Sequence, residues 1–293
     1  MTKILYLFTR TPLHVGAGAS VGAIDQPIQR ERHTGFPVIP ASSLKGTFAD
    51  AWNTTLQDGK RGGGTAAWLF GSDDPASAAA GSVLFGEARL LAFPIRSAKG
   101  SFAWITCPLI LRRAVRDGVL ANTLLPAATP ADEQALFVEA SPLALDRQVV
   151  LEEYTFTRSG ELPLGLGDAL AQLLKDGDSE LDPVWKEVAS RLVILSDGMM
   201  SFFAQNACEV AQHVKINDET GTAEGGALFN QENVPGETLF YSVMQFMAGR
   251  GDTFKGKNPD EARNEFSAKL AGRVFQFGGD ASTGLGYCTV KLS

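Results

Sequence analysis

The sequence predicts a single α+β domain over residues 1–293, a ferredoxin-like or RRM-like split βαβ arrangement with a helical insertion. Three observations predict this class. The N-terminal part reads as strand, helix, strand and strand, and the C-terminal part reads as strand, helix and strand. Between them, residues 112–195 carry prolines and two candidate helices. With no internal repeat in the chain, that stretch indicates an insertion rather than a second domain.

Strands in the N-terminal part are predicted from short apolar runs. Residues 3–9, 83–95 and 102–106 are apolar and show little helical periodicity. After the first of them comes a glycine-rich segment that continues into a long loop, residues 10–41. Its glycines and prolines keep the backbone out of regular helix, so we expect an irregular region there.

A helix is expected to follow this loop. Ser42 or Ser43 can cap its first turn, and the apolar pattern continues to about residue 54. One face carries apolar side chains at every fourth position, namely Leu44, Phe48 and Trp52. Because Lys45 falls off this stripe, we expect it to be exposed near the helix N-terminus.

The remaining elements are predicted from caps and periodicity. Asn258, followed by Pro259 and an acidic first turn, begins a helix that Gly272 ends. Helices are also expected at residues 168–175, from residue 182 onward and at 196–211. Strands are expected at residues 213–216, 239–246, 273–277 and 287–292, the first two enclosing a polar loop.

Composition leaves the choice of partner open. The net charge of −7 and the pI of about 5.1 argue against a nucleic-acid protein, because phosphate binding needs a basic surface. Local charge differs from the mean, since residues 26–46 carry Arg30, Arg32, His33 and Lys45 against Glu31 alone. The three cysteines lack metal-type spacing, which favours a reducing cytoplasm. No apolar run is long enough to cross a membrane, so no membrane partner is expected.

The densest glycine cluster lies in residues 277–287, just before the last expected strand. It lacks the Gly-Lys-Ser/Thr of a P-loop and opens a strand, so neither that motif nor the dinucleotide fingerprint applies. Backbone N–H groups in such a loop can hold a phosphate, and glycine permits close approach. A plain β-turn without a ligand is an equally good interpretation of these residues alone.

Three ordered blocks together resemble the RAMP superfamily, the repeat-associated proteins of CRISPR systems. Residues 11–18 read TPLHVGAG, residues 37–46 read PVIPASSLKG, and the glycine loop before the last strand completes the pattern. A further block, residues 214–241, is similar to the repeated backbone subunit of type III-B (Cmr) CRISPR effector complexes. The resemblance is weak between residues 55 and 195.

The resemblance implies a fold, a site of action and a set of partners. It implies an RNA-binding palm, and a protruding β-hairpin thumb at residues 212–238 that interrupts the duplex between guide and target. Leu228 and Phe229 in that segment either wedge between bases or anchor the hairpin to a neighbouring subunit. The implied partners are a CRISPR guide RNA, a single-stranded target RNA, copies of the chain in a helical filament and other CRISPR effector subunits.

The family match also implies the cleavage residue. Asp25 matches the cleavage-loop aspartate, although a lone aspartate in a loop is usually just solvated. The expected chemistry is attack by the target 2′-OH on the adjacent phosphate. Asp25 is expected to hold a divalent metal, Mg²⁺ or Mn²⁺, that stabilises the developing charge. His14 is the alternative, either as an acid–base catalyst or as a structural or guide-contacting residue.

Binding of the guide is expected along the same segments. Lys45 at a helix N-terminus combines a positive charge with free backbone donors, which suits a phosphate. The other expected contacts are Ser43, Arg30, Arg32, Gly278, Gly279, Gly284 and Gly286. Two further functions stay open, a non-catalytic RNA-binding scaffold of the same kind of complex and a stand-alone RAMP endoribonuclease that processes the guide precursor.

Overall fold

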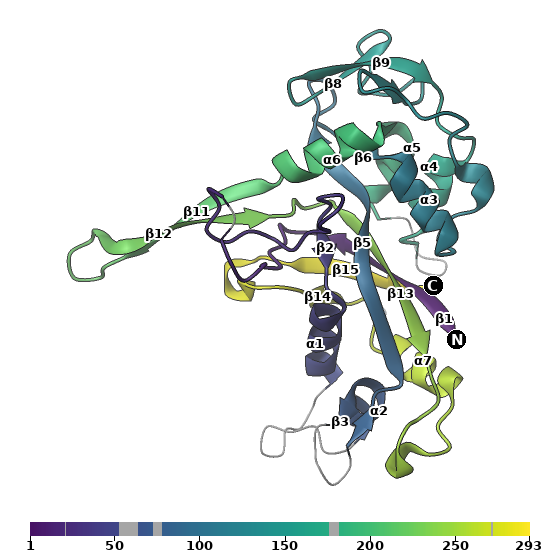
Figure 1. The fold of residues 1–293 in the computed structure, drawn as a ribbon, viewed down its shortest axis with the longest axis vertical. Helices are drawn as coiled ribbons and strands as arrows, with labels where there is room; N and C mark the ends of the chain where they lie inside the picture. The colour runs from purple at the N-terminus through teal and green to yellow at the C-terminus, as the bar shows by residue number, and fades with distance from the viewer. Residues whose placement is uncertain (21, 53–63, 73–77, 176–181, 271) are drawn as a thin grey trace.

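The structure is a computed structural model that describes residues 1–20, 22–52, 64–72, 78–175, 182–270 and 272–293. It is a mixed α+β fold. Within the described residues, one large mixed sheet contains eleven strands, and two further sheets have two strands each. In Figure 1 the large sheet runs through the whole body, and one hairpin projects from it.

Four strands lie side by side in one half of the large sheet. They are β1 (Thr2–Thr9), β5 (Val83–Arg96), β13 (Leu239–Phe246) and β15 (Tyr287–Leu292). Their order is β15-β1-β13-β5, and each neighbouring pair is antiparallel. The short strands β2 (Val38–Ile39) and β14 (Val274–Gln276) pair with β5 and β15. All the strands predicted in these segments are present, with ends that differ by at most one residue.

Two helices cover this part of the sheet. They are α1 (Ala41–Trp52), which follows β1 in the chain, and α7 (Pro259–Ser267), which follows β13. The helix start predicted at Asn258 forms, and there the structure shows a capping box with both reciprocal hydrogen bonds to Glu261. The expected α1 stripe is buried, and Phe48 lies within 6.1 Å of the rings of Trp52, Phe85, Phe266, Phe275 and Phe277. Residues 53 and 54, where we expected the helix to end, lie outside the described residues.

The middle of the chain corrects one expectation. Residues 112–195 are not a helical insertion, because four of their segments are strands that extend the large sheet in the order β6-β10-β7-β9-β8. These four strands are β7 (Gln134–Leu136), β8 (Gln148–Leu151), β9 (Tyr154–Gly160) and β10 (Leu192–Ile194), and they continue the sheet beyond β6 (Phe102–Thr106). Three strands of four residues or fewer are too short to show a clear two-residue period, so the pattern did not reveal them.

Short helices pack around these strands and at the opposite end of the body. They are α3 (Pro108–Arg116), α4 (Leu166–Gln172) and α5 (Val188–Arg191), with 3-10 turns at Asn122–Leu124 and Trp185–Glu187. At the other end lie α2 (Gly64–Phe70), the pair β3 (Gly71–Ser72) and β4 (Ala79–Ala80), and the 3-10 turn Asp252–Phe254. A further 3-10 turn, Ala281–Thr283, lies in the glycine loop before β15. The helix expected at residues 168–175 corresponds to α4, and the one expected from residue 182 becomes a 3-10 turn followed by α5.

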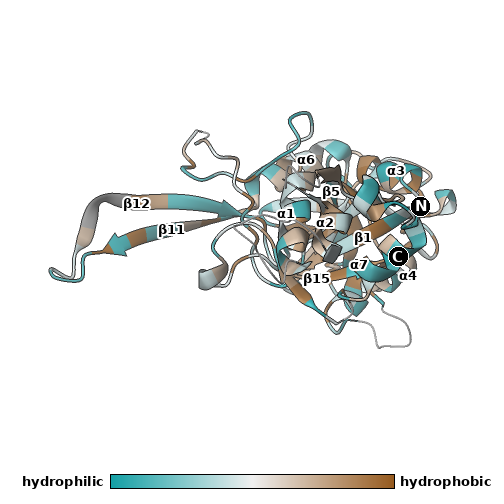
Figure 2. Ribbon diagram, turned by 90° about the horizontal axis from the view of Figure 1, so that it is seen from below, coloured by the Kyte–Doolittle hydropathy of each residue, from teal (hydrophilic) through white to brown (hydrophobic). Residues whose placement is uncertain are grey.

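A long hairpin projects from the body (Figures 1 and 2). Its strands are β11 (Glu209–Ile216) and β12 (Ala223–Asn233), and α6 (Asp197–Asn206) precedes them. The helix expected at residues 196–211 therefore ends at Asn206. The strand at residues 213–216 pairs with β12, whereas we expected residues 239–246 as its partner. The polar sequence of β12 concealed it, because one face of this hairpin meets solvent rather than a core.

Among the described residues, no helix is long and apolar enough to cross a membrane.

Candidate functional site

Three consecutive residues at the body end of β12 hold three separate segments of the chain. Asn230 binds the loop that carries Asp25, Gln231 binds Asp280 of the C-terminal glycine loop, and Glu232 binds the segment around His14. These partners lie about 50 to 220 positions away in the sequence. The base of the hairpin therefore gathers the three motifs that the sequence analysis singled out.

Asp25 is exposed, and two hydrogen bonds to Asn230 of β12 hold it in place. Its backbone N–H donates to Asn230 Oδ1 at 2.8 Å, and its Oδ2 accepts from the Asn230 backbone N–H at 2.9 Å. The Asn230 amide also donates to the carbonyl of Ala23 at 2.9 Å. Within the described residues, no other hydrogen bond to the Asp25 carboxylate is found, so one of its oxygens is available to a ligand.

His14 lies beside Asp25 in the same cleft, which has a volume of about 330 Å³ and is also lined by Gly16, Gly18 and Gln26. The side chain is 7% exposed. Its Nδ1 lies 2.7 Å from the carbonyl oxygen of Glu232, and because a carbonyl only accepts, Nδ1 carries the proton. A Cβ on Gly16 would lie 2.9 Å from Nε2, so glycine is needed there for the ring to fit.

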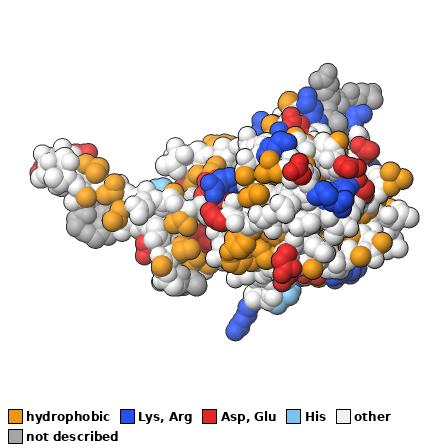
Figure 3. Space-filling model, turned by 90° about the horizontal axis from the view of Figure 1, so that it is seen from above, with side chains coloured by type: hydrophobic (Ala, Val, Ile, Leu, Met, Phe, Trp, Pro, Cys, Tyr) orange, Lys and Arg blue, Asp and Glu red, His pale blue; other side chains and the backbone are white. Residues whose placement is uncertain are grey.

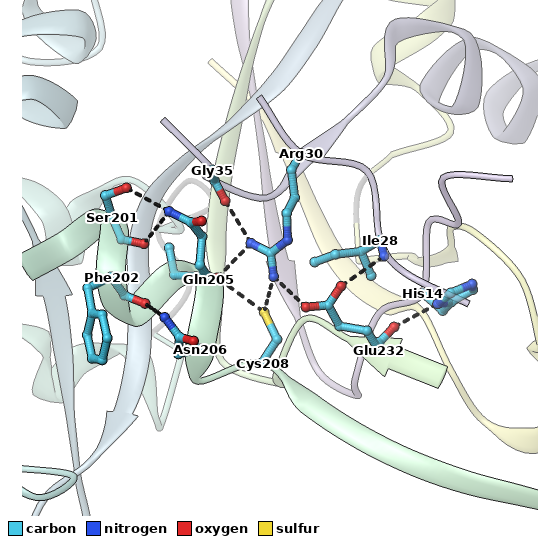
Figure 4. A network of polar contacts seen from close by, with 11 residues as sticks. His14, Ile28, Arg30, Gly35, Ser201, Phe202, Gln205, Asn206, Cys208 and Glu232 are labelled. Carbon is cyan, nitrogen blue, oxygen red and sulfur yellow. Dashed lines mark hydrogen bonds and ion pairs between the residues drawn. The ribbon is translucent and has the colours of Figure 1, made fainter. Parts of the chain in front are cut away.

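Buried Glu232 and half-buried Arg30 form an ion pair beneath the cleft (Figure 4). Arg30 Nη2 donates to Glu232 Oε1 at 2.6 Å, and the other carboxylate oxygen accepts from the N–H of Ile28 at 3.1 Å. Arg30 Nη1 donates to the carbonyls of Gly35 and Ala204 at 2.7 Å each. The guanidinium is thus committed to protein acceptors, so a structural role fits Arg30 better than the guide contact we predicted.

Some of the C-terminal glycines are packed closely against backbone carbonyls, and Gly284 is not. Gly278 and Gly279 lie against His14, whose carbonyl accepts from the N–H of Gly279 at 2.9 Å. A Cβ on Gly278 would lie 2.0 Å from that carbonyl oxygen, and one on Gly286 would lie 1.9 Å from the carbonyl oxygen of Phe277. Gly284 has open space around it. Close packing therefore explains Gly278 and Gly286 without a phosphate, and contact of these glycines with RNA stays a prediction.

Lys45 is exposed on the first turns of α1, as predicted. It lines a second cleft of about 460 Å³, with Ser42, Phe70, Gly71 and Gly81. Ser43 is half-buried next to it and lies outside the lining of that cleft. Of the described residues, none lines both this cleft and the one that holds Asp25.

Arg32 lies in a third cleft, where two basic runs of the sequence meet. This cleft is lined by residues 29–33, by Arg89 of β5, and by Arg113 and Arg116 at the end of α3. Arg113 donates to Glu31 at 2.8 Å and lies 3.0 Å from His33 Nε2. Burial opposes the ionisation of Glu31, but hydrogen bonds from Thr34 and Arg113 outweigh it and hold the pKa of Glu31 below its ordinary value. The carboxylates of Glu31 and Asp117 form ion pairs with arginines of this cleft and so neutralise much of its positive charge.

The donors around Asp25 allow only part of a metal site. Groups of three or more His, Cys, Asp or Glu side chains that could hold a metal are absent from the described residues. One carboxylate therefore fits a hard divalent cation only if phosphate oxygens of a bound RNA complete the coordination, a mode that Mg²⁺ commonly uses.

The two apolar hairpin residues differ in their surroundings. Leu228 is 66% exposed and lies opposite Val214 on the free part of the hairpin. Phe229 stacks on His213, with ring centroids 5.2 Å apart. Both belong to strand β12 rather than to a loop. In Figure 3 hydrophobic side chains are visible along the projecting hairpin.

None of the sequence motifs identifies Asn230 and Gln231, and Glu232 falls only within the block of residues 214–241 that resembles the family. The available signal was a run of polar residues, 230–233, which is separated by five residues from the buried strand β13. It does not identify the partners, because these come from remote parts of the chain. All but Asn230 of these residues are buried, and buried polar groups require partners.

The fold and the cleft define a class of protein: a large mixed sheet with a projecting hairpin, whose base carries an exposed aspartate and a glycine loop. The chain belongs to the RAMP superfamily, whose family model matches residues 7–289.

Two sequence relatives and one solved structure are similar to the chain over most of its length. The chain is 32% identical to the "CRISPR system Cmr endoribonuclease Cmr4" of Pyrococcus furiosus, with 98% of this chain and 94% of the relative covered. It is 26% identical to the "CRISPR system CMR subunit Cmr4" of Saccharolobus solfataricus, with 86% of each covered. The crystal structure of oligomeric Cmr4 from Pyrococcus furiosus superposes with a TM-score of 0.70 at 25% identity, and it covers 100% of this chain and 97% of that one.

Proposed function

We propose that this chain is a guide-RNA-binding backbone subunit of a type III-B CRISPR effector complex and that it cleaves complementary target RNA. The observation that carries the proposal is the shared cleft of Asp25 and His14 at the base of the projecting hairpin. Support comes from the 32% identical relative, which is named an endoribonuclease, and from the oligomeric crystal form of Cmr4. The test is cutting of a complementary RNA by the assembled complex, with Asp25→Asn as the decisive variant.

In this proposal each part of the fold has a task. The strands β15-β1-β13-β5, with α1 and α7, are an RRM-like palm, because the order of strands and helices along the chain is that of a split βαβ unit. The hairpin β11–β12 is the thumb that interrupts the duplex of guide and target. Copies of the chain stack along the guide, so that each thumb distorts the target at a regular interval.

Cleavage then depends mainly on geometry. A target nucleotide displaced by the thumb can bring its 2′-OH in line with the next phosphate, and such positioning accounts for much of the rate. We assign to Asp25 the task of holding a divalent cation, which when bound supplies positive charge against the developing negative charge of the phosphate. The Nδ1–H of His14 donates a hydrogen bond to the backbone carbonyl of Glu232, which orients the ring toward the cleft. We assign it a contacting rather than an essential role.

Lys45 is expected to bind one phosphate of the guide. Lys45→Ala should weaken RNA binding and reduce the slope of log K against log salt by about the share of one phosphate contact, ~0.7 for a single strand. Lys186→Ala is the matched control, because it removes the same charge from an exposed turn of residues 185–187. The binding constant is measured over a series of salt concentrations. Equal affinity and slope for both variants would remove Lys45 from the guide path.

The exposed apolar residues of the hairpin are expected to serve assembly. Val214 and Leu228 lie directly opposite each other, and their replacement by serine removes apolar contact area while the strands stay paired. The double variant should assemble fewer copies per guide RNA in sedimentation experiments. Val274→Ser, which changes an exposed residue of the edge strand β14, is the control and should assemble normally. Normal assembly of the double variant, together with altered cutting, would assign these residues to the RNA instead.

A further inference from the structure

We infer that Asn230 is a positioning residue, which fixes the carboxylate of Asp25 and makes the cleavage loop move with the hairpin. This inference rests on the proposed function, because it concerns how Asp25 is presented to the target. Asn230 lies outside the glycine and lysine motifs of the sequence, and it acts on the reaction only through its neighbour.

Every polar group of Asn230 is bonded to the loop that carries Asp25. The side-chain oxygen accepts from the Asp25 N–H at 2.8 Å, and the side-chain nitrogen donates to the Ala23 carbonyl at 2.9 Å. The backbone N–H donates to Asp25 Oδ2 at 2.9 Å, and the backbone carbonyl accepts from the N–H of Gln26 at 3.1 Å. These four bonds join two exposed segments separated by 205 positions in the chain.

Asparagine is the side chain suited to this place. An aspartate could accept from the Asp25 N–H, but it could not donate to the Ala23 carbonyl and would add a second negative charge beside the first. An alanine would keep only the two backbone bonds. Because Asp25 Oδ2 is held by a backbone N–H of β12, the direction of the other carboxylate oxygen follows the strand.

The same bonds couple the loop to the hairpin. Asn230 is part of β12, where it pairs with Gln212 of β11. A rotation of the hairpin caused by bound target RNA therefore carries the Asp25 carboxylate with it. Catalytic groups need placement to within about 0.5 Å. This attachment therefore keeps Asp25 at a constant position relative to the thumb hairpin when the hairpin moves.

The experiment compares Asn230→Ala with Gln212→Ala in the assembled complex. Gln212 is exposed and lies opposite Asn230 at the same height of the hairpin, so it is a matched control. Asn230→Ala should lower the single-turnover cutting rate at saturating target by about 10- to 100-fold, the equivalent of two hydrogen bonds. The target concentration for half-saturation should stay unchanged. Hydrogen exchange of the amides in residues 23–26 should accelerate, and Gln212→Ala should change none of these quantities.

A double variant separates positioning from a general loss of structure. In an Asp25→Asn background, Asn230→Ala should cause little further loss, because a residue that acts only through Asp25 has nothing left to position. Additive losses, or a wild-type rate for Asn230→Ala, would overturn the inference. If Asp25→Asn is inactive while Asn230→Ala cuts normally, only the positioning role fails. If Asp25→Asn itself cuts normally, the proposed function fails instead.

Discussion

Asp25→Asn should leave guide and target binding intact and lower the cutting rate by about a thousandfold or more, the equivalent of ~4 kcal/mol of transition-state stabilisation. The substitution keeps the shape of the side chain, and its oxygen can still accept from the backbone N–H of Asn230. The loop therefore keeps its place while the negative charge is lost. Single-turnover cutting of a complementary RNA by the assembled complex, with binding measured separately, gives the two quantities.

Removal of divalent cations is the companion test. A chelator should stop the wild-type complex as completely as the substitution does, and added Mg²⁺ or Mn²⁺ should restore only the wild type. If the target 2′-OH is the nucleophile, the upstream fragments should end in a 2′,3′-cyclic phosphate. Undiminished cutting in chelator would exclude the cation from the reaction while leaving Asp25 to be tested by itself.

Gly278→Ala should be among the most destabilising single changes in the glycine loop. Gly278 has a φ of 76°, which an alanine adopts at a cost of about 1–2 kcal/mol. Its Cβ would also lie 2.0 Å from the carbonyl oxygen of His14, and overpacking of this kind costs a further ~1–3 kcal/mol. We expect a loss of about 4 kcal/mol in the free energy of unfolding, measured by denaturant titration, together with slower cutting because the His14 segment must shift.

Two neighbouring glycines supply matched controls. Gly284 also has a positive φ, of 90°, but a Cβ there meets nothing within 4 Å, so Gly284→Ala should show only the backbone penalty. Gly279→Ala should be nearly neutral, since its Cβ would only touch the His14 ring at 3.8 Å. Equal losses for Gly278→Ala and Gly284→Ala would mean that the contact with His14 contributes nothing.

The sequence predicted the elements that have strong local signals. The helix start at Asn258, the stripe that contains Phe48 and the flanking strands all lie where periodicity and caps placed them. Strand β12 and the short strands of the middle region were not predicted. Their side chains carry no continuous two-residue apolar period, because β12 has a solvent-facing surface and the others have four residues or fewer, apart from β9.

The site was predictable only as separate pieces. His14, Asp25 and the glycine loop were identified from motifs, but nothing local shows that Asn230, Gln231 and Glu232 bind them. Arg30 illustrates the reverse case: its charge suggested an RNA contact, whereas its donors are used by Glu232 and by backbone carbonyls. Composition reports how many charges a segment has, and only the fold decides which of them are neutralised internally.

The most direct test of the catalytic role compares Asp25→Asn with His14→Ala in complexes that bind the same guide and target equally well. The measured quantity is the single-turnover rate of cutting at each position of a complementary RNA. We predict regularly spaced cuts in the wild type, loss of all of them in Asp25→Asn, and a smaller reduction in His14→Ala. Wild-type cutting by Asp25→Asn with an inactive His14→Ala would replace the proposed mechanism by histidine acid–base catalysis. Full activity of both variants would leave this chain as an RNA-binding scaffold.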